Sequence, residues 1–261
     1  MMESASALAY LARIDDRGPV EPTPDTLQRL HVAHLLHVPF ENLDIHLGRP
    51  IVLDVDRFYH KIVTERRGGF CYELNGLFAE LLRTLDFDVT LLSARVAGQD
   101  GEFGLEFDHL VLLVQLEQPW LADVGFGDSF RQPLPLQADV VTQQDFGTYR
   151  LVQTDATWFL QALGDSGDWQ PEYAFTGQPR LLADFAEMCH FQQTSPASHF
   201  TQKRVCSRAT PEGRITLSDR RLITSRGSRR EERVLSNEAE VAAVLAREFG
   251  IELRPGPQGP G

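Results

Sequence analysis

One cysteine of this chain stands where a sulfur could act as a nucleophile. Cys71 follows the glycine pair Gly68-Gly69 and lies in the first turn of the strongest predicted helix. A helix N-terminus presents unpaired N–H groups and about half a positive charge, and both favour the thiolate, which is the reactive form of cysteine. The other two cysteines, Cys189 and Cys206, lack such a setting and are expected to be core residues. Cys71 is therefore the predicted nucleophile, provided that a base lies near it.

The best candidate for that base is His109, one of eight histidines in the chain. It opens the apolar run 110–114, which is typical of a buried strand, where a lone histidine is more often a core residue. Asp123, however, is the single carboxylate of a second apolar run at 120–124, and a buried carboxylate needs a partner. From a neighbouring strand it would orient the imidazole and stabilise its protonated form. Cys71, His109 and Asp123 therefore predict a nucleophile, a base and a carboxylate that orients the base.

Three further histidines raise the question of a metal site. His31, His34 and His37 recur at a spacing of three on one predicted helix. Their side chains would spread over roughly 120° of the helix surface, and no carboxylate or cysteine is locally placed to complete a site. We expect no metal.

The nucleophile belongs to a helical first third of the chain. Thr23 is a suitable N-cap for a helix over 24–37, and Asp54 can cap a second helix that ends at the glycine pair 68–69. A third helix begins near Cys71 and has a continuous apolar stripe. The stripe consists of Leu74, Leu77, Phe78, Leu81, Leu82 and Leu85.

The base and the carboxylate belong to a region of strands that begins at residue 88. Strands are expected at 89–96, 107–116, 120–124, 149–153 and 157–163. A helix follows at 181–192, then short strands around Val205, Ile215, Leu222 and Val234. A last helix is capped by Ser236 or Asn237 and closed by Gly250.

This order of elements predicts an α+β protein of several domains. We expect a helical domain over 1–87, a strand domain over 88–180, an interdomain helical segment over 181–202, and an α/β domain over 203–261. The last domain ends in a Pro/Gly-rich tail from Pro255, which is expected to be flexible.

Composition excludes several classes of protein. The 261 residues include 25 basic and 37 acidic side chains, for a net charge of −12, which argues against a nucleic-acid or anionic-membrane surface. The longest aliphatic run, 110–114, is too short to span a bilayer, and the N-terminus does not resemble a signal peptide. Three cysteines do not make a disulfide framework. We expect a cytoplasmic protein, whose oligomeric state the sequence leaves open.

One segment departs from the acidic average. Between Lys203 and Arg233 there are ten basic and four acidic side chains, and Arg204 and Arg208 begin the series. Arginines are common on solvated strands, which is one interpretation. The other is an anion site for a phosphorylated ligand within an acidic protein.

Four motifs of this sequence resemble those of the arylamine N-acetyltransferases. They are PFENLD at 39–44, RGGFCYELN at 67–75, HLVLLV at 109–114 and DVGFG at 123–127, in the same order and at compatible spacings. The resemblance extends from about residue 5 to about residue 250 and is weakest in the last third. It implies a helical first domain, a central antiparallel β-barrel and a C-terminal α/β lid around a papain-like Cys-His-Asp core.

The resemblance also implies a ping-pong reaction with acetyl-CoA as co-substrate. Cys71 would take the acetyl group as a thioester and release CoA. An arylamine, arylhydrazine or arylhydroxylamine would then attack this intermediate, and His109 would collect the proton lost as the amide forms. The backbone N–H of Cys71 is a reasonable donor to the tetrahedral oxyanion.

The family pattern further implies two sets of binding residues. Phe40, Phe126 and Phe200 match aromatic residues of the acceptor pocket, although ordinary core packing would also explain them. Gly125 and Gly127 would let their loop approach the pantetheine end of CoA, although turn geometry is an alternative. We place the CoA phosphates at the arginine-rich segment, with Arg204 and Arg208 as the expected contacts.

Two other functions fit part of the same pattern. Papain-like hydrolases and transglutaminase-like cross-linkers also place a cysteine at a helix N-terminus and a histidine and an Asp or Asn on later strands. The motif at 39–44 does not support that assignment. A binding module that has kept the fold without catalysis is the third option, and the presence of all three catalytic residue types argues against it.

Overall fold

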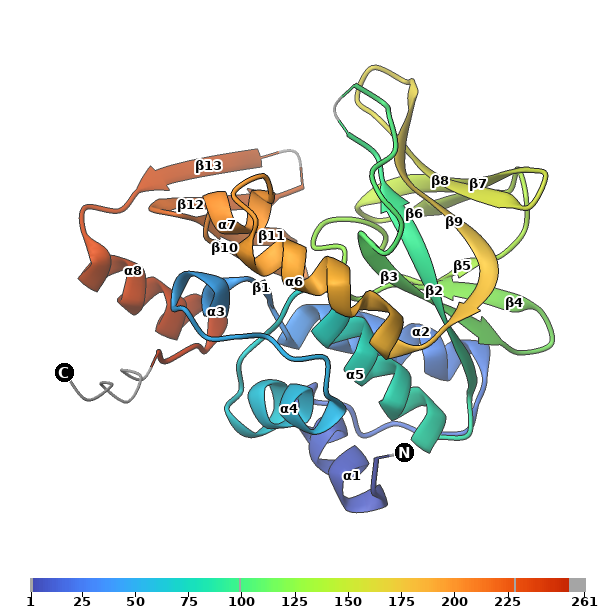
Figure 1. Ribbon diagram of the computed structural model, residues 1–261, viewed down its shortest axis with the longest axis horizontal. Coiled ribbons are helices and arrows are strands. Elements are labelled where there is room, and N and C mark those ends of the chain that lie inside the picture. The colour runs from blue at the N-terminus through green and yellow to red at the C-terminus, as the bar shows by residue number, and fades with distance from the viewer. Residues whose placement is uncertain (1, 99, 228, 254–261) are drawn as a thin grey trace.

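The computed structural model describes residues 2–98, 100–227 and 229–253, and it has three parts (Figure 1). Helices of the N-terminal part lie below a strongly curved sheet, and a second sheet with its own helix lies beside both. This is the multidomain α+β architecture that the sequence predicts. The tail from Pro255, which was expected to be flexible, lies outside the described residues.

The helices begin where local capping residues allow. Thr23 Oγ1 accepts from the N–H of Thr26 at 3.2 Å, and Asp54 and Asn237 cap later helices in the same way. Gly250 has a φ of +69° and ends the last helical segment. The α-helices are α1 (Ser4–Arg13), α2 (Pro24–His37), α3 (Leu43–His46), α4 (Val55–Tyr59), α5 (Cys71–Thr84), α6 (Ala186–Thr194), α7 (His199–Gln202) and α8 (Glu238–Val244). A 3₁₀ turn at Leu182–Phe185 precedes α6, and π-helical turns extend α4 over His60–Thr64 and α8 over Leu245–Phe249.

The strands form two antiparallel sheets. One has the order β5-β4-β3-β2-β9-β8-β7-β6 and curves into a nearly closed barrel, and the other has the order β1-β10-β11-β12-β13. The strands of the barrel sheet are β2 (Asp88–Val96), β3 (His109–Gln115), β4 (Pro119–Ala122), β5 (Leu134–Pro135), β6 (Val141–Gln144), β7 (Gly147–Thr154), β8 (Thr157–Leu163) and β9 (Trp169–Arg180). The strands of the second sheet are β1 (Phe40–Glu41), β10 (Val205–Thr210), β11 (Gly213–Ser218), β12 (Arg221–Arg226) and β13 (Arg229–Val234).

The strand β9 has no counterpart in the sequence prediction. It contains Pro171, Gly177 and Pro179, residue types that weaken a strand pattern. Its pairing with β8 shifts register between Leu160 and Gln161, so that Pro171 lies at an irregularity of the ladder. Such a bulge accommodates a residue that lacks an N–H.

The helix α5 is the central element of the structure. Its apolar stripe is buried, and it packs against β2 and β3 on one side and α4 on the other. Strand β1, from the N-terminal part, pairs with β10 through Phe40 opposite Ser207 and Glu41 opposite Cys206. The first and last parts of the chain therefore share a sheet. None of the described helices is both long and apolar enough to cross a membrane.

Candidate active site

The structure brings His109 and Asp123 together inside the protein. His109 is the first residue of β3, and Asp123 follows the last residue of β4. Because the two strands are antiparallel neighbours, the start of β3 meets the end of β4. The His109 Nε2 and Asp123 Oδ2 atoms are 2.6 Å apart, and both side chains are buried. The pair is thus arranged so that the carboxylate orients the imidazole.

Hydrogen-bond donors stabilise the ionised form of the Asp123 carboxylate. Its Oδ1 accepts from Asn75 Nδ2 at 2.8 Å and from the N–H of Gly125 at 2.9 Å. Burial pushes the pKa of Asp123 up, but His109, Asn75 and the Gly125 N–H together lower it below its usual value. The carboxylate is therefore charged at neutral pH.

His31, on α2, forms a hydrogen bond with the backbone of Asp123. Its Nε2 accepts from the Asp123 N–H at 3.0 Å, and its Nδ1 donates to the Arg131 carbonyl at 2.8 Å. Burial lowers the pKa of His31 to about 4, so the ring is neutral. Of the other two histidines on α2, His34 contacts the Tyr10 hydroxyl and His37 contacts the Ala33 carbonyl. In the described part of the chain no group of histidines, cysteines and carboxylates is placed to hold a metal.

Cys71 is the first residue of α5 and is buried. Two contacts connect this end of the helix to the strand that begins at His109 and to the residues just before it. The Tyr72 hydroxyl donates to the Phe107 carbonyl at 2.7 Å, and Asn75 Nδ2 donates to the Leu110 carbonyl at 2.7 Å. Asn75 lies four residues after Cys71, on the same face of the helix. The face of α5 that presents Cys71 is therefore turned toward the His109–Asp123 pair.

The loop after Asp123 packs directly on Cys71. A Cβ at Gly125 would lie 2.9 Å from the Cys71 Cα and 3.0 Å from its carbonyl oxygen, so a side chain there would displace the loop. Gly127 has a φ of +96°, which favours glycine, and it faces the ring of Phe40. Contacts within the protein thus account for both glycines, and their contact with CoA stays a prediction.

The electrostatic setting of Cys71 differs from what the helix N-terminus alone suggests. Burial raises the pKa of the Cys71 thiol well above its usual value, and the carboxylates of Asp108 and Asp123 add to this effect. The N–H of Tyr72 acts in the opposite direction but does not outweigh them. Desolvation depends on tertiary packing, which the sequence does not reveal. A thiolate at this position needs a cation beside it.

The three predicted pocket phenylalanines are all partly exposed. The ring of Phe200 lies 6.1 Å from that of Phe40, between centroids, and 5.9 Å from that of Phe70. The ring of Phe126 lies 5.2 Å from that of His109. Aromatic side chains therefore border the site from β1, from the loop after β4 and from α7.

The two arginines expected at the CoA phosphates both have protein partners. Arg204 makes a two-pronged contact with Glu238, at 2.7 and 2.8 Å. Arg208 donates to the carbonyls of Leu36 and Glu248. Arg204 thus connects two elements of the C-terminal part, Arg208 also connects this part to α2, and the role of both toward CoA stays a prediction.

Two positioning residues of this site, Asn75 and His31, were not identified from the sequence. Each is a polar residue that lies among apolar residues of its helix, and each is fully buried. The spacing of Asn75 from Cys71 was a usable signal, because four residues along a helix return to the same face. Nothing local indicates the contact between His31 and Asp123.

Comparison with known proteins agrees with this arrangement. A family model described as N-acetyltransferase matches residues 23–257. The arylamine N-acetyltransferase of Escherichia coli is 36% identical over 246 residues, which cover 93% of this chain and 87% of that protein. The structure of the Salmonella typhimurium arylamine N-acetyltransferase has a TM-score of 0.91 at 34% identity, covering 100% of this chain and 96% of that chain. The Mycobacterium marinum enzyme in complex with CoA has a TM-score of 0.87 at 34% identity, covering 94% and 92%. This chain belongs to the arylamine N-acetyltransferase family.

Proposed function

We propose that this protein transfers an acetyl group from acetyl-CoA to an arylamine, arylhydrazine or arylhydroxylamine, with Cys71 as the carrier of the acetyl group. The observation that carries the proposal is the buried His109–Asp123 pair, which Asn75 connects to the first turn of α5. Relatives named arylamine N-acetyltransferase and a neighbour solved with CoA support the same pair of substrates.

In the first half-reaction the imidazole of His109 takes the proton of the Cys71 thiol. The resulting imidazolium supplies the cation that the buried thiolate needs, and Asp123 stabilises it. The sulfur then attacks the carbonyl carbon of the acetyl thioester, and the N–H of Cys71 donates to the oxyanion. Collapse breaks the bond between the acetyl carbon and the CoA sulfur, and CoA leaves with the proton from His109. One thioester replaces another, so this step needs no energy source.

In the second half-reaction the amine attacks the acetyl-Cys71 carbonyl. His109, which is neutral again, takes the proton that the nitrogen loses. The Cys71 sulfur leaves, and the proton returns to it. Amide formation from a thioester is downhill and drives the cycle. Arylamines are weak bases that are unprotonated at neutral pH, so their lone pair is available.

The aromatic residues around the site fit a flat acceptor. Phe40, Phe126 and Phe200 would stack on its ring and keep water from the acetyl thioester, which water would otherwise hydrolyse. Gly125 and Gly127, which keep their loop close to Cys71, would adjoin the pantetheine end of CoA, and Arg204 and Arg208 its phosphates.

The test is the mass of the protein after brief exposure to acetyl-CoA alone. We expect a gain of about 42 Da on Cys71, as a thioester replaces the thiol, and its loss when an arylamine is added. Cys71→Ala should neither gain this mass nor form product, while Cys189→Ala, which changes another buried cysteine, should do both. Product formation without a mass gain at Cys71 would contradict the acetyl-cysteine intermediate. A protein that shows neither would contradict the proposed function, and peptide hydrolysis or cross-linking would then be the reaction to assay.

A further inference from the structure

The segment that carries Phe200 is fastened to the start of β3 by one side chain. Gln192, on α6, is buried, and its Nε2 donates to Asp108 Oδ1 at 2.6 Å. Asp108 immediately precedes His109 in the chain. A residue of the interdomain segment therefore contacts the strand start that presents the base.

The same side chain also contacts the turn before α7. The Ser198 hydroxyl lies 2.6 Å from Gln192 Oε1 and 2.9 Å from the Gln192 carbonyl, and it accepts from the N–H of Phe200 at 3.2 Å. Ser198 is buried and is the N-cap of α7. A continuous set of hydrogen bonds thus runs from Asp108 through Gln192 and Ser198 to the backbone of Phe200.

Other hydrogen bonds also hold the nucleophile and its partners, although the Asp108 carbonyl itself lies 3.3 Å from the Tyr72 hydroxyl. Tyr72 and Asn75 hold α5 against β3, and His31 holds the Asp123 backbone. Gln192 contacts none of these residues in the hydrogen bonds of the described chain. Removing its side chain should therefore disturb the position of the Phe200 ring more than the positions of the reactive groups.

We propose that Gln192 is a positioning residue that fixes the Phe200 side of the acceptor pocket relative to His109. The inference rests on the proposed function, in which the amine enters against Phe200 only after acetyl transfer to Cys71. Gln192 therefore serves the second half-reaction and not the first. It also limits the access of water to the acetyl thioester, because a displaced ring leaves the thioester less enclosed.

Gln192→Leu separates the two half-reactions. In single-turnover experiments we expect the rate of CoA release to change less than about twofold, and the second-order rate of arylamine attack on acetyl-Cys71 to fall about 10-fold. Hydrolysis of the acetyl-enzyme without amine should rise. If CoA release falls as much as amine attack, Gln192 has only a general structural role and the inference is wrong.

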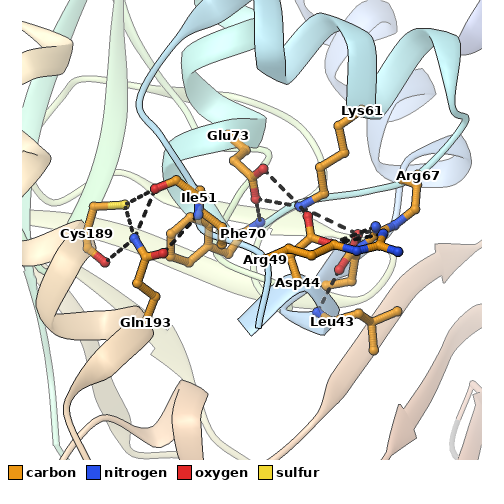
Figure 2. A network of polar contacts seen from close by, with 11 residues as sticks. Leu43, Asp44, Arg49, Ile51, Lys61, Arg67, Phe70, Glu73, Cys189 and Gln193 are labelled. Atoms are coloured by element: carbon orange, nitrogen blue, oxygen red, sulfur yellow. Dashed lines mark hydrogen bonds and ion pairs between the residues drawn. The ribbon is translucent and has the colours of Figure 1, made fainter. Parts of the chain in front are cut away.

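The matched control is Gln193→Leu, on the same helix. Figure 2 shows that Gln193 points toward Ile51 and Cys189. It contacts the Ile51 N–H at 2.8 Å, the Ile51 carbonyl at 3.0 Å and the Cys189 carbonyl at 3.1 Å. This variant loses a comparable set of bonds without touching Asp108 or Ser198. Equal loss of amine attack in both variants would overturn the inference, whereas a wild type that gains no acetyl group would instead contradict the proposed function.

A conservative variant provides a measurement that would not change if the substitution only loosened the packing. Gln192→Glu puts a second carboxylate at hydrogen-bond distance from Asp108, and the two can bond only when they share a proton. The ratio of amine attack in the variant to that in the wild type should therefore fall as the pH rises from about 5.5 to about 8.5. The groups facing Asp108, namely His109, His199, Cys71 and Tyr72, also interact with the added charge, so the same ratio is measured for CoA release, and only a pH dependence specific to amine attack supports the inference. A ratio that does not change with pH would contradict the contact.

Discussion

Two regions of this protein are rich in charged side chains, and they use them differently. The first, which we call the buried charge network, consists of Glu41, Asp44, Lys61, Arg67 and Glu73. Figure 2 shows Asp44, Lys61, Arg67 and Glu73 pointing toward one another near Phe70. Lys61 Nζ lies 2.9 Å from Glu73 and 2.8 Å from Asp44, and Arg67 lies 2.7 Å from both Glu41 and Asp44. The second region is the outer edge of the C-terminal sheet, where every residue of β13 is exposed.

The comparison shows that solvent, more than residue type, decides what a charge contributes. In the buried charge network, burial pushes the pKa of Lys61 down, but Glu41, Glu73 and Asp44 outweigh it and raise the pKa above its usual value. These buried side chains remain ionised because each one contacts side chains of opposite charge. Glu73 also accepts from the Phe70 N–H at 3.1 Å, so the network holds the residue before Cys71. Exposed pairs such as Arg221 with Glu232 compete with water and contribute little.

The largest effect is expected from Arg67→Met. It leaves Glu41 and Asp44 buried with fewer partners, and breaking a buried pair costs about 3–5 kcal/mol. Urea unfolding measures the loss of the free energy of unfolding. Arg66→Met, which changes an exposed neighbour, is the control and should cost less than about 0.5 kcal/mol. Equal, small losses in the two variants would remove the contrast between the regions.

An intermediate effect on the free energy of unfolding is expected from Glu172→Gln. Glu172 is largely buried, and in the described residues its carboxylate accepts a hydrogen bond from the Ser129 hydroxyl and not from a cation. Burial raises its pKa to about 7, and the carboxylates of Asp123 and Asp128 contribute. Between the unfolded value and about pH 7 the folded protein binds more protons than the unfolded one, so Glu172 makes stability fall as the pH rises. Glu172→Gln should remove up to about 3 kcal/mol of this fall between about pH 5 and pH 8.

Unfolding of both proteins at several pH values measures this difference. Glu106, which accepts from the Ser93 hydroxyl but is largely exposed, provides the control variant Glu106→Gln. If the free energy of unfolding depends on pH in the same way in wild type and Glu172→Gln, the carboxylate is solvated and the prediction is wrong.

The smallest effect on stability is expected from Arg204→Ala. Its contact with Glu238 is exposed, and such pairs contribute less than about 1 kcal/mol. If Arg204 meets a CoA phosphate, as we propose, the KM for acetyl-CoA should rise about fivefold, while the KM for the arylamine should not change. Steady-state kinetics with each substrate varied in turn checks this. An unchanged KM for acetyl-CoA would remove Arg204 from the CoA site.

Most of the helices could be predicted because their signals are local. Thr23, Asp54 and Asn237 each cap the helix that follows within three residues, and the stripe of α5 is continuous. Strand β9 was missed because its proline and glycine residues weaken the local pattern. Its pairing with β2 and β8 compensates for that weakness, and pairing is a property of the fold.

The candidate site also contains features that local sequence predicts and features that depend on the fold. The types and positions of Cys71, His109 and Asp123 were visible in the sequence, because a carboxylate in an apolar strand is unusual. The support from His31 was not, because it joins residues that lie far apart in the chain. The high pKa of Cys71 was not predictable either, since burial is its largest cause.

The pairing of β1 with β10 has a consequence for the order in which this protein matures on the ribosome. All three residues of the proposed catalytic set have been synthesised by the time Asp123 emerges. In the folded protein Phe40 has Gly69 as a backbone neighbour on one side and Ser207 on the other, and the strand that supplies Ser207 begins only at Val205. A nascent chain therefore contains the nucleophile well before it can complete the aromatic enclosure. The last third of the chain, though it contains none of the three proposed catalytic residues, determines when the proposed site is complete.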